Sequence, residues 1–386
     1  MIENIKHVIM VILFYFFRLC PIKQNKIVFC NFRGKGYGGN CKYIAEKILE
    51  QKNLNLDLVW LYRSERESIP DGIRAVKYAS LAFVYELCTA KVWVDNCRKP
   101  GYVRKKKDQY YIMTWHGSIG LKKVEKDAEK ALCNTYVSAA KRDSRMADLF
   151  LASSKFDERD YRQIFWYSGE IMRCGLPRED ILYENNQNLK NQIKESIGIS
   201  KDAGVVMYAP TFRVGEKDNC LSMFQIDWSR LLDAFSTRFS GQWYGIIRLH
   251  PNIAKFGDKL IKGEKVFNGT SYPDMQELML ISDCIITDYS STITEFSKNG
   301  KPGFVFAKDM DAYAEDRGAR FDFEELPFPF AQDEDQLIDN VLSFDDEKYK
   351  KDNKAFFHDR CGIYEGGHAS EQVVNRIFEV IYSGKR

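Results

Sequence analysis

The sequence predicts an α/β protein made of two doubly wound units, each a parallel sheet with helices on both faces. Short apolar and β-branched segments alternate with longer helical patterns, which is the alternation that βαβ units produce. This alternation stops at a polar stretch over residues 184–201 and then starts again. The chain has 386 residues, of which 45% are hydrophobic and 29% charged, and is therefore long enough to bury two substantial cores.

The first half is predicted from apolar segments that are separated by helical ones. Each apolar segment is short, as the strands of a buried parallel sheet are. In chain order, we predict strands at residues 26–32, 56–62, 91–95, 109–115 and 149–153, and helices at 40–51, 80–89 and after 157.

The second half repeats this pattern. In chain order, we predict strands at residues 204–211, 244–249, 284–287 and 303–307, and helices at 228–239, 275–281 and 292–299. The predicted domains are a Rossmann-like unit over 23–180 and a second over 181–386, whose last helix is able to pack back on the first. Ligands of such sheets bind beyond the carboxyl ends of the strands, so we expect the units to face a cleft with one substrate on each half.

The cysteines and the charge exclude several classes of protein. No two of the ten cysteines are spaced as Cys-x-x-Cys, so we interpret them as reduced core thiols of a cytosolic protein. Cysteines and histidines do not cluster at ligand spacing, and no acidic cluster has the pattern of a magnesium site, so we expect no metal and no cofactor. The net charge of +3 excludes a nucleic-acid binder held by bulk charge.

Residues 8–17 form an uninterrupted apolar and aromatic run, flanked by Lys6, His7 and Arg18. A bilayer-spanning helix needs about 20 such residues, and the run lacks a small-residue cleavage site, so neither a span nor a signal peptide is favoured. We expect residues 1–22 to form a helix in the cytoplasmic membrane interface, with its basic residues at anionic headgroups. The alternative is a helix packed on the domain's own core.

A basic cluster follows the third predicted strand. It contains Arg98, Lys99, Arg104, Lys105, Lys106 and Lys107. Such a cluster is either a solvated loop or a surface that contacts anionic lipid or a polyanionic substrate. We place Arg104, Lys105 and Lys106 on the acceptor and membrane side of the molecule.

Two of the five histidines follow predicted strands. His116 lies in Thr-Trp-His-Gly and His250 in Arg-Leu-His-Pro, one in each half. A strand-end histidine is often structural, but two of them beside Gly or Pro would direct both imidazoles into the expected cleft. Imidazole titrates near neutral pH, so either is able to abstract a proton or to place a charge on a phosphate.

Other candidate residues lie at strand ends in the second half. Hydroxyls and backbone N–H groups at a strand-to-helix turn suit a phosphate, although the same turn is also an ordinary helix cap. The turn contains Asp288, Ser290, Ser291 and Thr292, with Glu295 one turn into the following helix, where it is either a ribose ligand or a surface acid. Thr211, Arg213 and Arg248 end neighbouring strands, and a guanidinium binds a phosphate through paired N–H groups.

A glycine-rich loop follows the first predicted strand over residues 31–40. It is neither a Walker loop nor a dinucleotide fingerprint, because the required spacings are missing. The loop still allows a ligand to approach the backbone closely. We place Gly36 and Asn40 of this loop, together with Lys122 and Lys123, on the acceptor side.

Seven motifs occur in order between residues 26 and 380. They are Thr114-Trp115-His116-Gly117 followed by Leu121-Lys122-Lys123, Gly175-Leu176-Pro177-Arg178, residues 208–213, Arg248 with His250-Pro251, residues 287–291, Lys301-Pro302, and residues 366–374. Together they resemble the CDP-glycerol glycerophosphotransferase family of teichoic-acid and capsule biosynthesis, and the length is similar to that of primase-type members.

The resemblance implies a GT-B fold with the nucleotide donor in the C-terminal half. The implied donor is CDP-glycerol or CDP-ribitol, and the implied acceptor is an undecaprenyl-linked saccharide or a growing polymer. It also implies a peripheral enzyme on the cytoplasmic face of the membrane and no nucleic-acid partner.

On this basis the acceptor hydroxyl attacks the phosphorus that carries the polyol, and CMP leaves. We assign His116 as the general base and His250, Arg248 and Arg213 to the pyrophosphate, although the roles of the two histidines are exchangeable at this stage. Asp288 and Glu295 would orient a histidine or bind ribose or polyol. The alternatives are a GT-B nucleotide-sugar glycosyltransferase and a non-catalytic scaffold of a polymer-assembly complex.

Overall fold

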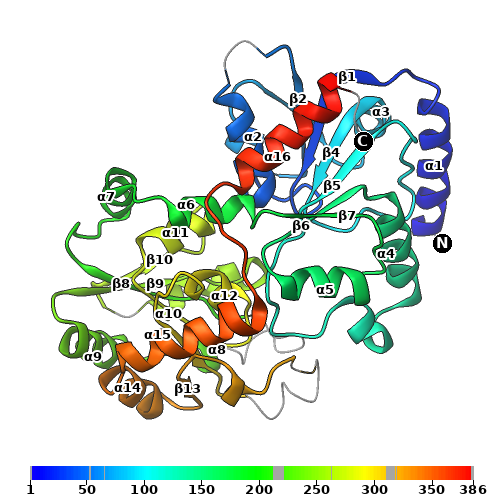
Figure 1. Cartoon of the computed structure of the whole chain (residues 1–386). Coiled ribbons are helices and arrows are strands. Elements are labelled where there is room, and N and C mark those ends of the chain that lie inside the picture. Colours follow the sequence, from blue (N-terminus) through cyan, green and yellow to red (C-terminus); the bar gives the residue numbers. More distant parts are fainter. Residues whose placement is uncertain are drawn as a thin grey trace. The chain divides into compact units, whose positions relative to one another are not determined.

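The chain divides into two compact units (Figure 1). The structure is a computed structural model that describes residues 2–51, 54–64, 66–211, 221–261, 263–309, 318 and 320–383. The first unit comprises Met1–His116, Val124–Asp180 and Ile363–Arg386, and the second comprises Gly117–Lys123 and Ile181–Gly362. The first unit is therefore discontinuous in sequence, because the segment at the end of the chain belongs to it.

The first unit contains a seven-stranded parallel sheet in the order β3-β2-β1-β4-β5-β6-β7. The strands are β1 (Lys23–Cys30), β2 (Asp57–Tyr62), β3 (Ile73–Lys77), β4 (Ala90–Asp95), β5 (Tyr110–Met113), β6 (Leu149–Ala152) and β7 (Glu170–Arg173). The strand order reverses between β1 and β4. The loops after these two strands therefore diverge at the position where doubly wound sheets bind ligands.

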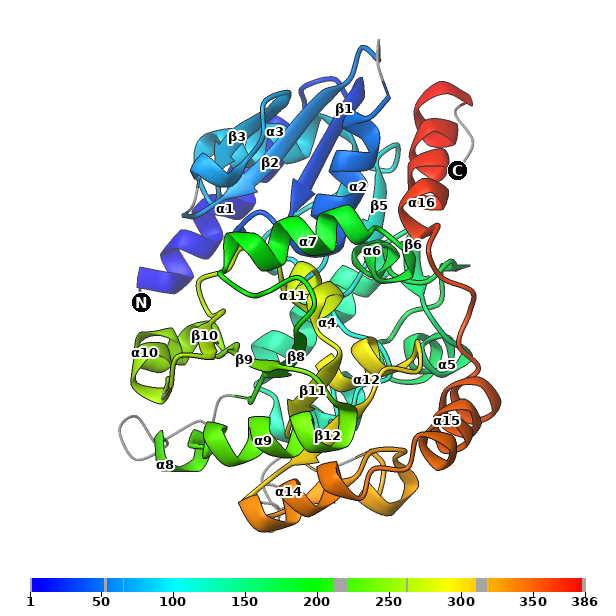
Figure 2. The ribbon, with the colours of Figure 1, turned by 90° about the vertical axis from the view of Figure 1, so that its left-hand side faces the viewer.

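Helices cover both faces of this sheet. They are α1 (Ile2–Phe17), α2 (Gly39–Leu49), α3 (Leu81–Thr89), α4 (Asn134–Met146), α5 (Lys155–Gln163), α6 (Asp180–Tyr183, which starts in this unit) and α16 (Ala369–Phe378). Alternate residues of a strand point to opposite faces, so β1 contributes to two cores. Val28 packs with Phe14 of α1 on one face, and Ile27 packs with Ile44 of α2 and Val373 of α16 on the other. Figures 1 and 2 show α16 beside α2.

The second unit repeats the architecture with a six-stranded parallel sheet in the order β10-β9-β8-β11-β12-β13. Its strands are β8 (Gly204–Tyr208), β9 (Trp243–Ile247), β10 (Val266–Asn268), β11 (Cys284–Thr287), β12 (Gly303–Phe306) and β13 (Phe330–Ala331). Its helices are α7 (Gln187–Ser196), α8 (Leu221–Phe224), α9 (Trp228–Phe239), α10 (Gly257–Leu260), α11 (Met275–Ile281), α12 (Thr292–Ser297), α14 (Glu334–Leu342) and α15 (Asp346–Lys354). The strand order again reverses between the first and fourth strands of the unit.

The fold class expected from the sequence is confirmed: two parallel α/β units, each Rossmann-like. Several predicted strands are too long at their ends. The strand predicted at 204–211 ends at Tyr208, because the backbone of Thr211 donates to the Asp288 carboxylate instead of continuing the ladder. The sequence analysis missed β3, β7, β10 and β13, which are short or exposed.

The cysteines that the structure describes differ in burial. All nine cysteines among the described residues are free thiols. Six of them are buried: Cys30, Cys41, Cys88, Cys174, Cys284 and Cys361. Cys220 lies outside the described residues.

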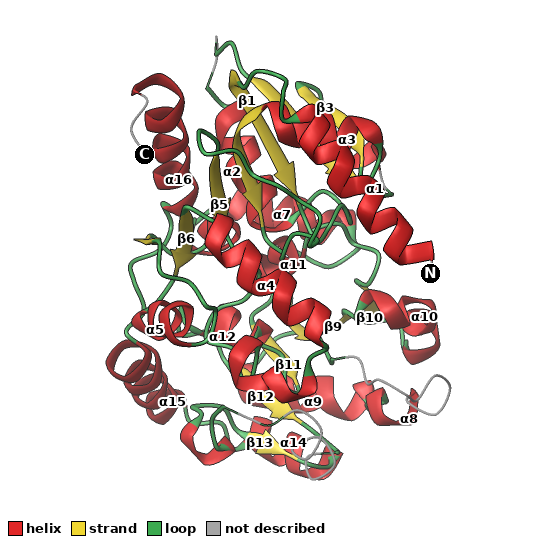
Figure 3. Ribbon diagram, turned by 90° about the vertical axis from the view of Figure 1, so that its right-hand side faces the viewer, coloured by secondary structure: helices red, strands yellow, loops and turns green. Residues whose placement is uncertain are grey.

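Helix α1 lies along the outside of the first unit (Figure 3) and has one buried and one exposed apolar face. Phe14 is fully buried in the sheet core, and Met10, Leu13 and Phe17 pack against the same core. The opposite face exposes six apolar side chains to the extent of 50–63%, those of Ile5, Val8, Ile9, Ile12, Tyr15 and Phe16, and Leu19, just after the helix, is 83% exposed. Packing on the core therefore accounts for only one side of the helix. Across the described residues, no helix has the length and apolar content of a membrane span.

Candidate active site

His116 lies in a tight turn directly after β5. The strand ladder ends where Thr114 N donates to Asp95 O at 2.9 Å, and Trp115 then takes a positive φ of 56°. Residues other than glycine adopt this left-handed conformation at a cost, so the turn has to be held by surrounding bonds. The reversal brings the imidazole of His116 back toward the loop after β4.

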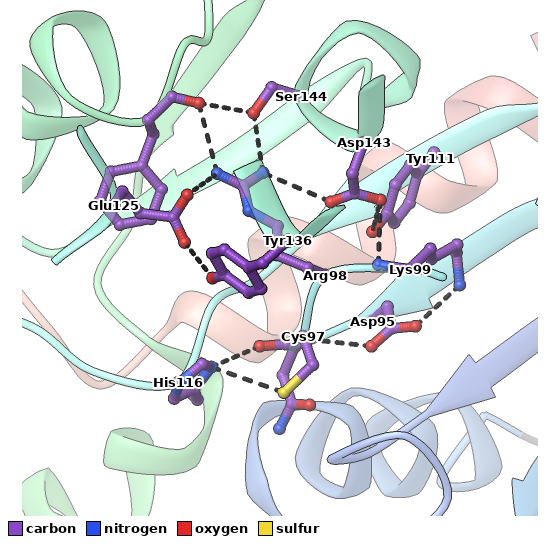
Figure 4. A network of polar contacts seen from close by, with 12 residues as sticks. Asp95, Cys97, Arg98, Lys99, Tyr111, His116, Glu125, Tyr136, Asp143 and Ser144 are labelled. Atoms are coloured by element: carbon purple, nitrogen blue, oxygen red, sulfur yellow. Dashed lines mark hydrogen bonds and ion pairs between the residues drawn. The ribbon is translucent and has the colours of Figure 1, made fainter. Parts of the chain in front are cut away.

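The imidazole of His116 has a defined tautomer. Its Nδ1 lies 2.6 Å from the carbonyl oxygen of Asn96 (Figure 4). A carbonyl only accepts, so Nδ1 carries the proton and Nε2 keeps a lone pair. Burial lowers the pKa of His116 to about 4; the bond to Asn96 opposes this shift, and the charges of Arg178, Arg98 and Arg33 add to it. The ring is therefore neutral at pH 7 and able to accept a proton.

A buried network of charges lies beneath this turn (Figure 4). The Arg98 guanidinium lies 3.1 Å from Glu125 and 3.3 Å from Asp143, and it donates to Ser144 at 2.7 Å. Arg98 also lies over the Trp115 ring, 5.6 Å from its centroid. Burial raises the pKa of Asp143 to about 6, although Arg98 opposes the shift. Through the contact of Arg98 with the Trp115 ring, the network supports the turn that carries His116.

Most side chains of the basic cluster at 98–107 bond to other groups of the first unit. The expectation of a solvated or lipid-facing cluster is wrong for Arg98 and Lys99, which are 3% and 4% exposed and form ion pairs, Lys99 with Asp95 at 2.7 Å. Arg104, Lys105 and Lys106 are partly buried, and Lys107 is exposed. Lys105 pairs with Asp148, Lys106 donates to the carbonyl of Cys20, and Arg104 donates to the carbonyls of Gly101 and Val103.

The glycine-rich loop after β1 is tied to the loop after β4. Asn96 accepts from Phe32 N at 2.7 Å and donates to the Asn31 side chain at 2.6 Å. Gly39, with φ of 60°, packs so closely that an added Cβ would lie 2.8 Å from the Asn31 oxygen. Gly36 also has a positive φ of 66°, and Asn40 is fully buried. The sequence analysis missed Asn96; its position directly after a buried strand is the signal that was available.

In the second unit, Asp288 joins the ends of β8 and β11. It is 2% exposed, and its carboxylate accepts from Thr211 N and Thr211 Oγ1, each at 3.0 Å, and from Tyr289 N at 2.7 Å. These three bonds hold together the loops after β8 and β11. None of the three involves a histidine.

The turn after Asp288 presents hydroxyl groups. Ser290 Oγ lies 2.7 Å from Thr292 Oγ1, and Ser290, Ser291 and Thr292 are partly exposed, whereas Glu295 is 4% exposed and is therefore not a surface acid. Thr294 Oγ1 donates to Ser118 O at 3.1 Å.

The segment Gly117–Lys123 follows His116 in the chain and belongs to the second unit. Its pairing partners are Gly318 and Arg320, which bond to the backbone of Lys123 and Leu121 at 3.2 and 3.0 Å. Lys122 is half-buried and Lys123 is exposed.

Arg248 and His250 follow β9 and differ in exposure. Arg248 Nη1 donates to the carbonyls of Gly269, Thr270 and Tyr272 at 2.5–3.0 Å. Burial lowers the pKa of Arg248, with Asp274 opposing the shift. His250 is exposed. Arg213, predicted beside them, lies outside the described residues.

Within the part of the chain that the structure describes, no three His, Cys, Asp or Glu side chains come together as a metal site. Beside the carboxylate of Asp288, the polar groups at the two strand-end turns include hydroxyl, amide, imidazole and guanidinium groups. Such groups bind anions and move protons.

Comparison with known proteins places this chain among teichoic-acid enzymes. A teichoic acid poly(glycerol phosphate) polymerase of Staphylococcus epidermidis is 30% identical over 93% of this chain and 51% of its own length. A protein of the same name from Bacillus spizizenii is 27% identical over 95% of both chains. The chain thus spans about half of the first relative and nearly all of the second.

Solved structures of the wall teichoic acid polymerase TagF share the fold. One of them, a histidine-to-asparagine variant soaked with CDPG, has a TM-score of 0.84 and 27% identity, over 99% of this chain and 97% of that one. The two-unit GT-B architecture is thereby confirmed. The family model for CDP-glycerol:poly(glycerophosphate) glycerophosphotransferases matches residues 12–379, and the chain belongs to that family.

Proposed function

We propose that this protein transfers a polyol phosphate from a CDP-linked polyol to an acceptor hydroxyl and releases CMP. Family membership supports this reaction class, and relatives named for glycerol phosphate and for ribitol phosphate make both polyols candidate donors. The observation that carries the proposal is the neutral imidazole of His116, whose Nδ1 is bonded to Asn96 O so that Nε2 is available as a base.

In the proposed reaction, His116 Nε2 accepts the proton of the acceptor hydroxyl as its oxygen attacks the phosphorus next to the polyol. The bond from this phosphorus to the oxygen of CMP breaks, and CMP leaves with the bonding electrons. His250, Arg248 and Arg213 would stabilise the charge on the pyrophosphate and on CMP, while Ser290, Ser291 and Thr292 would hold phosphate oxygens.

The low pKa of His116 has a consequence for this step. Burial disfavours the imidazolium in the protein without substrate, and the guanidinium groups of Arg178, Arg98 and Arg33 add to this effect. A bound pyrophosphate carries negative charge, which favours the imidazolium and raises the basicity of the ring. We therefore propose that donor binding brings His116 closer to the pKa that suits a general base.

We further propose that the exposed face of α1 lies in the interface of an anionic membrane, where a lipid-linked acceptor would be found. The six exposed apolar side chains of this face recur at helical spacing from Ile5 to Phe16, and the exposed Leu19 follows just after the helix. Burial lowers the pKa of Arg142 of α4, the neighbouring charges of Arg104 and Arg145 lower it further, and Tyr15 opposes the shift. Mutually repelling cations beside an apolar helix face suit anionic headgroups.

The transfer is tested by CMP release from purified protein. CDP-glycerol and CDP-ribitol are supplied separately, with and without a lipid-linked disaccharide acceptor, and UDP- and GDP-sugars are supplied in parallel. We expect acceptor-dependent CMP release from one CDP donor. Turnover of a UDP- or GDP-sugar instead would support the glycosyltransferase alternative and overturn the proposal.

The membrane proposal has its own test. We expect Phe16→Glu to reduce cosedimentation with vesicles of anionic phospholipid at least tenfold, since a charge replaces an inserted ring. Leu342→Glu is the matched control, because Leu342 is a 44% exposed apolar residue of α14, in the other unit. Equal binding by wild type and both variants would contradict insertion of α1.

A further inference from the structure

The turn that carries His116 is held by side chains that come from distant parts of the first unit. Asn40, in the first turn of α2, donates to Trp115 O at 3.0 Å and to Thr114 O at 3.5 Å. Its own side-chain oxygen accepts from Arg178 N at 3.1 Å. Arg178 in turn donates through Nη2 to His116 O at 3.0 Å. Two side chains thus bond to the carbonyls of three consecutive residues, 114–116.

These bonds hold the part of the turn whose backbone is strained, at Trp115. Trp115 has the positive φ of 56°, a region that a residue with a Cβ adopts only at an energetic cost. Asn40 is 0% exposed and Arg178 is 7% exposed, so water does not replace these bonds easily. The turn keeps its shape because Asn40 and Arg178 fix its carbonyls.

We infer that Asn40, together with Arg178, is a positioning residue that holds His116 in the orientation in which Nδ1 meets Asn96 O and Nε2 remains available to substrate. Asn40 is fully buried, so in this structure it does not reach an acceptor. Its effect on the reaction passes through the backbone of residues 114–116. The catalytic part of this inference rests on the proposed function, whereas the orientation of His116 does not.

Gln109 provides a matched control for Asn40. It lies in the same unit, is 2% exposed, and precedes β5, whereas His116 follows that strand. Its amide donates to the carbonyls of Leu87 and Ala90, each at 2.6 Å, and accepts from Lys106 N at 2.8 Å. The two amides therefore make the same kind of bonds at comparable burial, at opposite ends of one strand.

The first measurement is the titration of His116 by NMR in wild type, Asn40→Ala and Gln109→Ala, with His116→Gln used to assign the signal. The groups that act on this imidazole are Arg178, Arg98 and Arg33, the Asn96 carbonyl and the Cys97 thiol at 3.7 Å. We expect Asn40→Ala to raise the His116 pKa by at least one unit toward the solvated value of about 6.5, because a loosened turn lets water reach the ring. Gln109→Ala is expected to leave it within about 0.3 units.

The second measurement is the pH dependence of CMP release by the same proteins. Asn40→Ala is expected to lower kcat about 10- to 100-fold, to leave the KM for the CDP donor within about threefold, and to move the acidic limb of the profile upward. Gln109→Ala is expected to change stability with no movement of that limb. Thr114→Val, which removes the hydroxyl bond to Trp115 O without changing shape, is expected to act like Asn40→Ala but more weakly.

An unchanged His116 pKa in a folded Asn40→Ala protein would overturn the inference, as would equal effects of Asn40→Ala and Gln109→Ala on the pH profile. Should Asn40→Ala fail to fold, Asn40→Ser, which is polar but too short to make the bonds to Trp115 O and Arg178 N, decides by the same criteria. Full activity of His116→Gln would refute the base assignment instead, and the NMR result would still decide whether Asn40 positions the ring.

Discussion

The two strand-end histidines occupy similar places in sequence and very different places in the structure. His116 follows β5 in a turn with a left-handed residue, its Nδ1 is bonded to Asn96 O, and burial lowers its pKa to about 4. His250 follows β9 and is exposed. A group that transfers a proton benefits from a fixed tautomer, whereas a group that contacts a charged ligand benefits from access. The difference supports His116 as base and His250 as a pyrophosphate ligand.

The largest effect is expected from alanine substitutions of the two histidines, which should change different quantities: kcat for His116 and CDP affinity for His250. His116→Ala should lower kcat for CMP release about 10²- to 10⁴-fold while CDP affinity stays within threefold, because the base is lost and the donor contacts remain. His250→Ala should weaken CDP binding, measured by calorimetry, by at least tenfold.

His358→Ala serves as the control, since His358 is an exposed histidine on the segment after α15. Loss of CDP binding in His116→Ala, with binding retained in His250→Ala, would exchange the two roles.

A smaller effect is expected on the free energy of unfolding, because the buried ring of His116 should make it depend on pH. The folded-state pKa of His116 is about 4, below the unfolded value of about 6.5, so the unfolded chain binds the extra proton between these values. The free energy of unfolding therefore decreases as pH falls from about 7 to 4, by on the order of 2–3 kcal/mol from this one residue. His116→Gln should remove this part of the pH dependence in urea unfolding.

The raised pKa of Asp143 acts in the opposite sense, but it is common to both proteins and cancels in the difference between them. If His116→Gln and wild type lose stability in parallel on acidification, His116 is not held neutral by the fold.

The smallest effect is expected at Cys97, whose sulfur lies 3.7 Å from His116 Nδ1. Burial raises the pKa of Cys97 to about 12, with Asp95 adding to the shift, so the thiol is neutral and provides no charge for the imidazole. Cys97→Ala should change kcat less than about twofold at pH 6–9, since the bond to Asn96 O already fixes the tautomer. A tenfold loss would show that the thiol takes part in orienting His116.

The parts of the fold that were predictable are those whose signal is local. The strands at the centre of each sheet are buried on both faces and appear in the sequence as continuous apolar runs, as in β4 and β11. Strand β7 lies at an edge, with both Glu170 and Arg173 exposed, so its four residues carry no such run. Helix α1 was predicted, but the division of its apolar residues between two faces depends on the sheet core beneath it.

The site was predictable to the same extent. A histidine after a strand is visible in sequence, and His116 and His250 were found in this way. The bonds that hold the His116 turn could not be predicted. Asn40 and Arg178 are 138 residues apart in the sequence and come into contact only when the segments that follow β1 and β7 fold together. The basic cluster was misread at Arg98 for a similar reason: its partners Glu125 and Asp143 lie on later segments.

The return of the chain end to the first unit sets an order of events during synthesis. Residues 1–180 provide all seven strands of the first sheet, but Val373, Val374 and Ile377 of α16, which cover one of its faces, are made 193 or more residues later (373 − 180 = 193). At about 5–20 residues per second, a ribosome needs roughly 10–40 s to make the intervening segment. During that interval the nascent first unit exposes apolar surface, so a fragment ending at residue 180 should aggregate, whereas one joined to residues 363–383 should remain soluble.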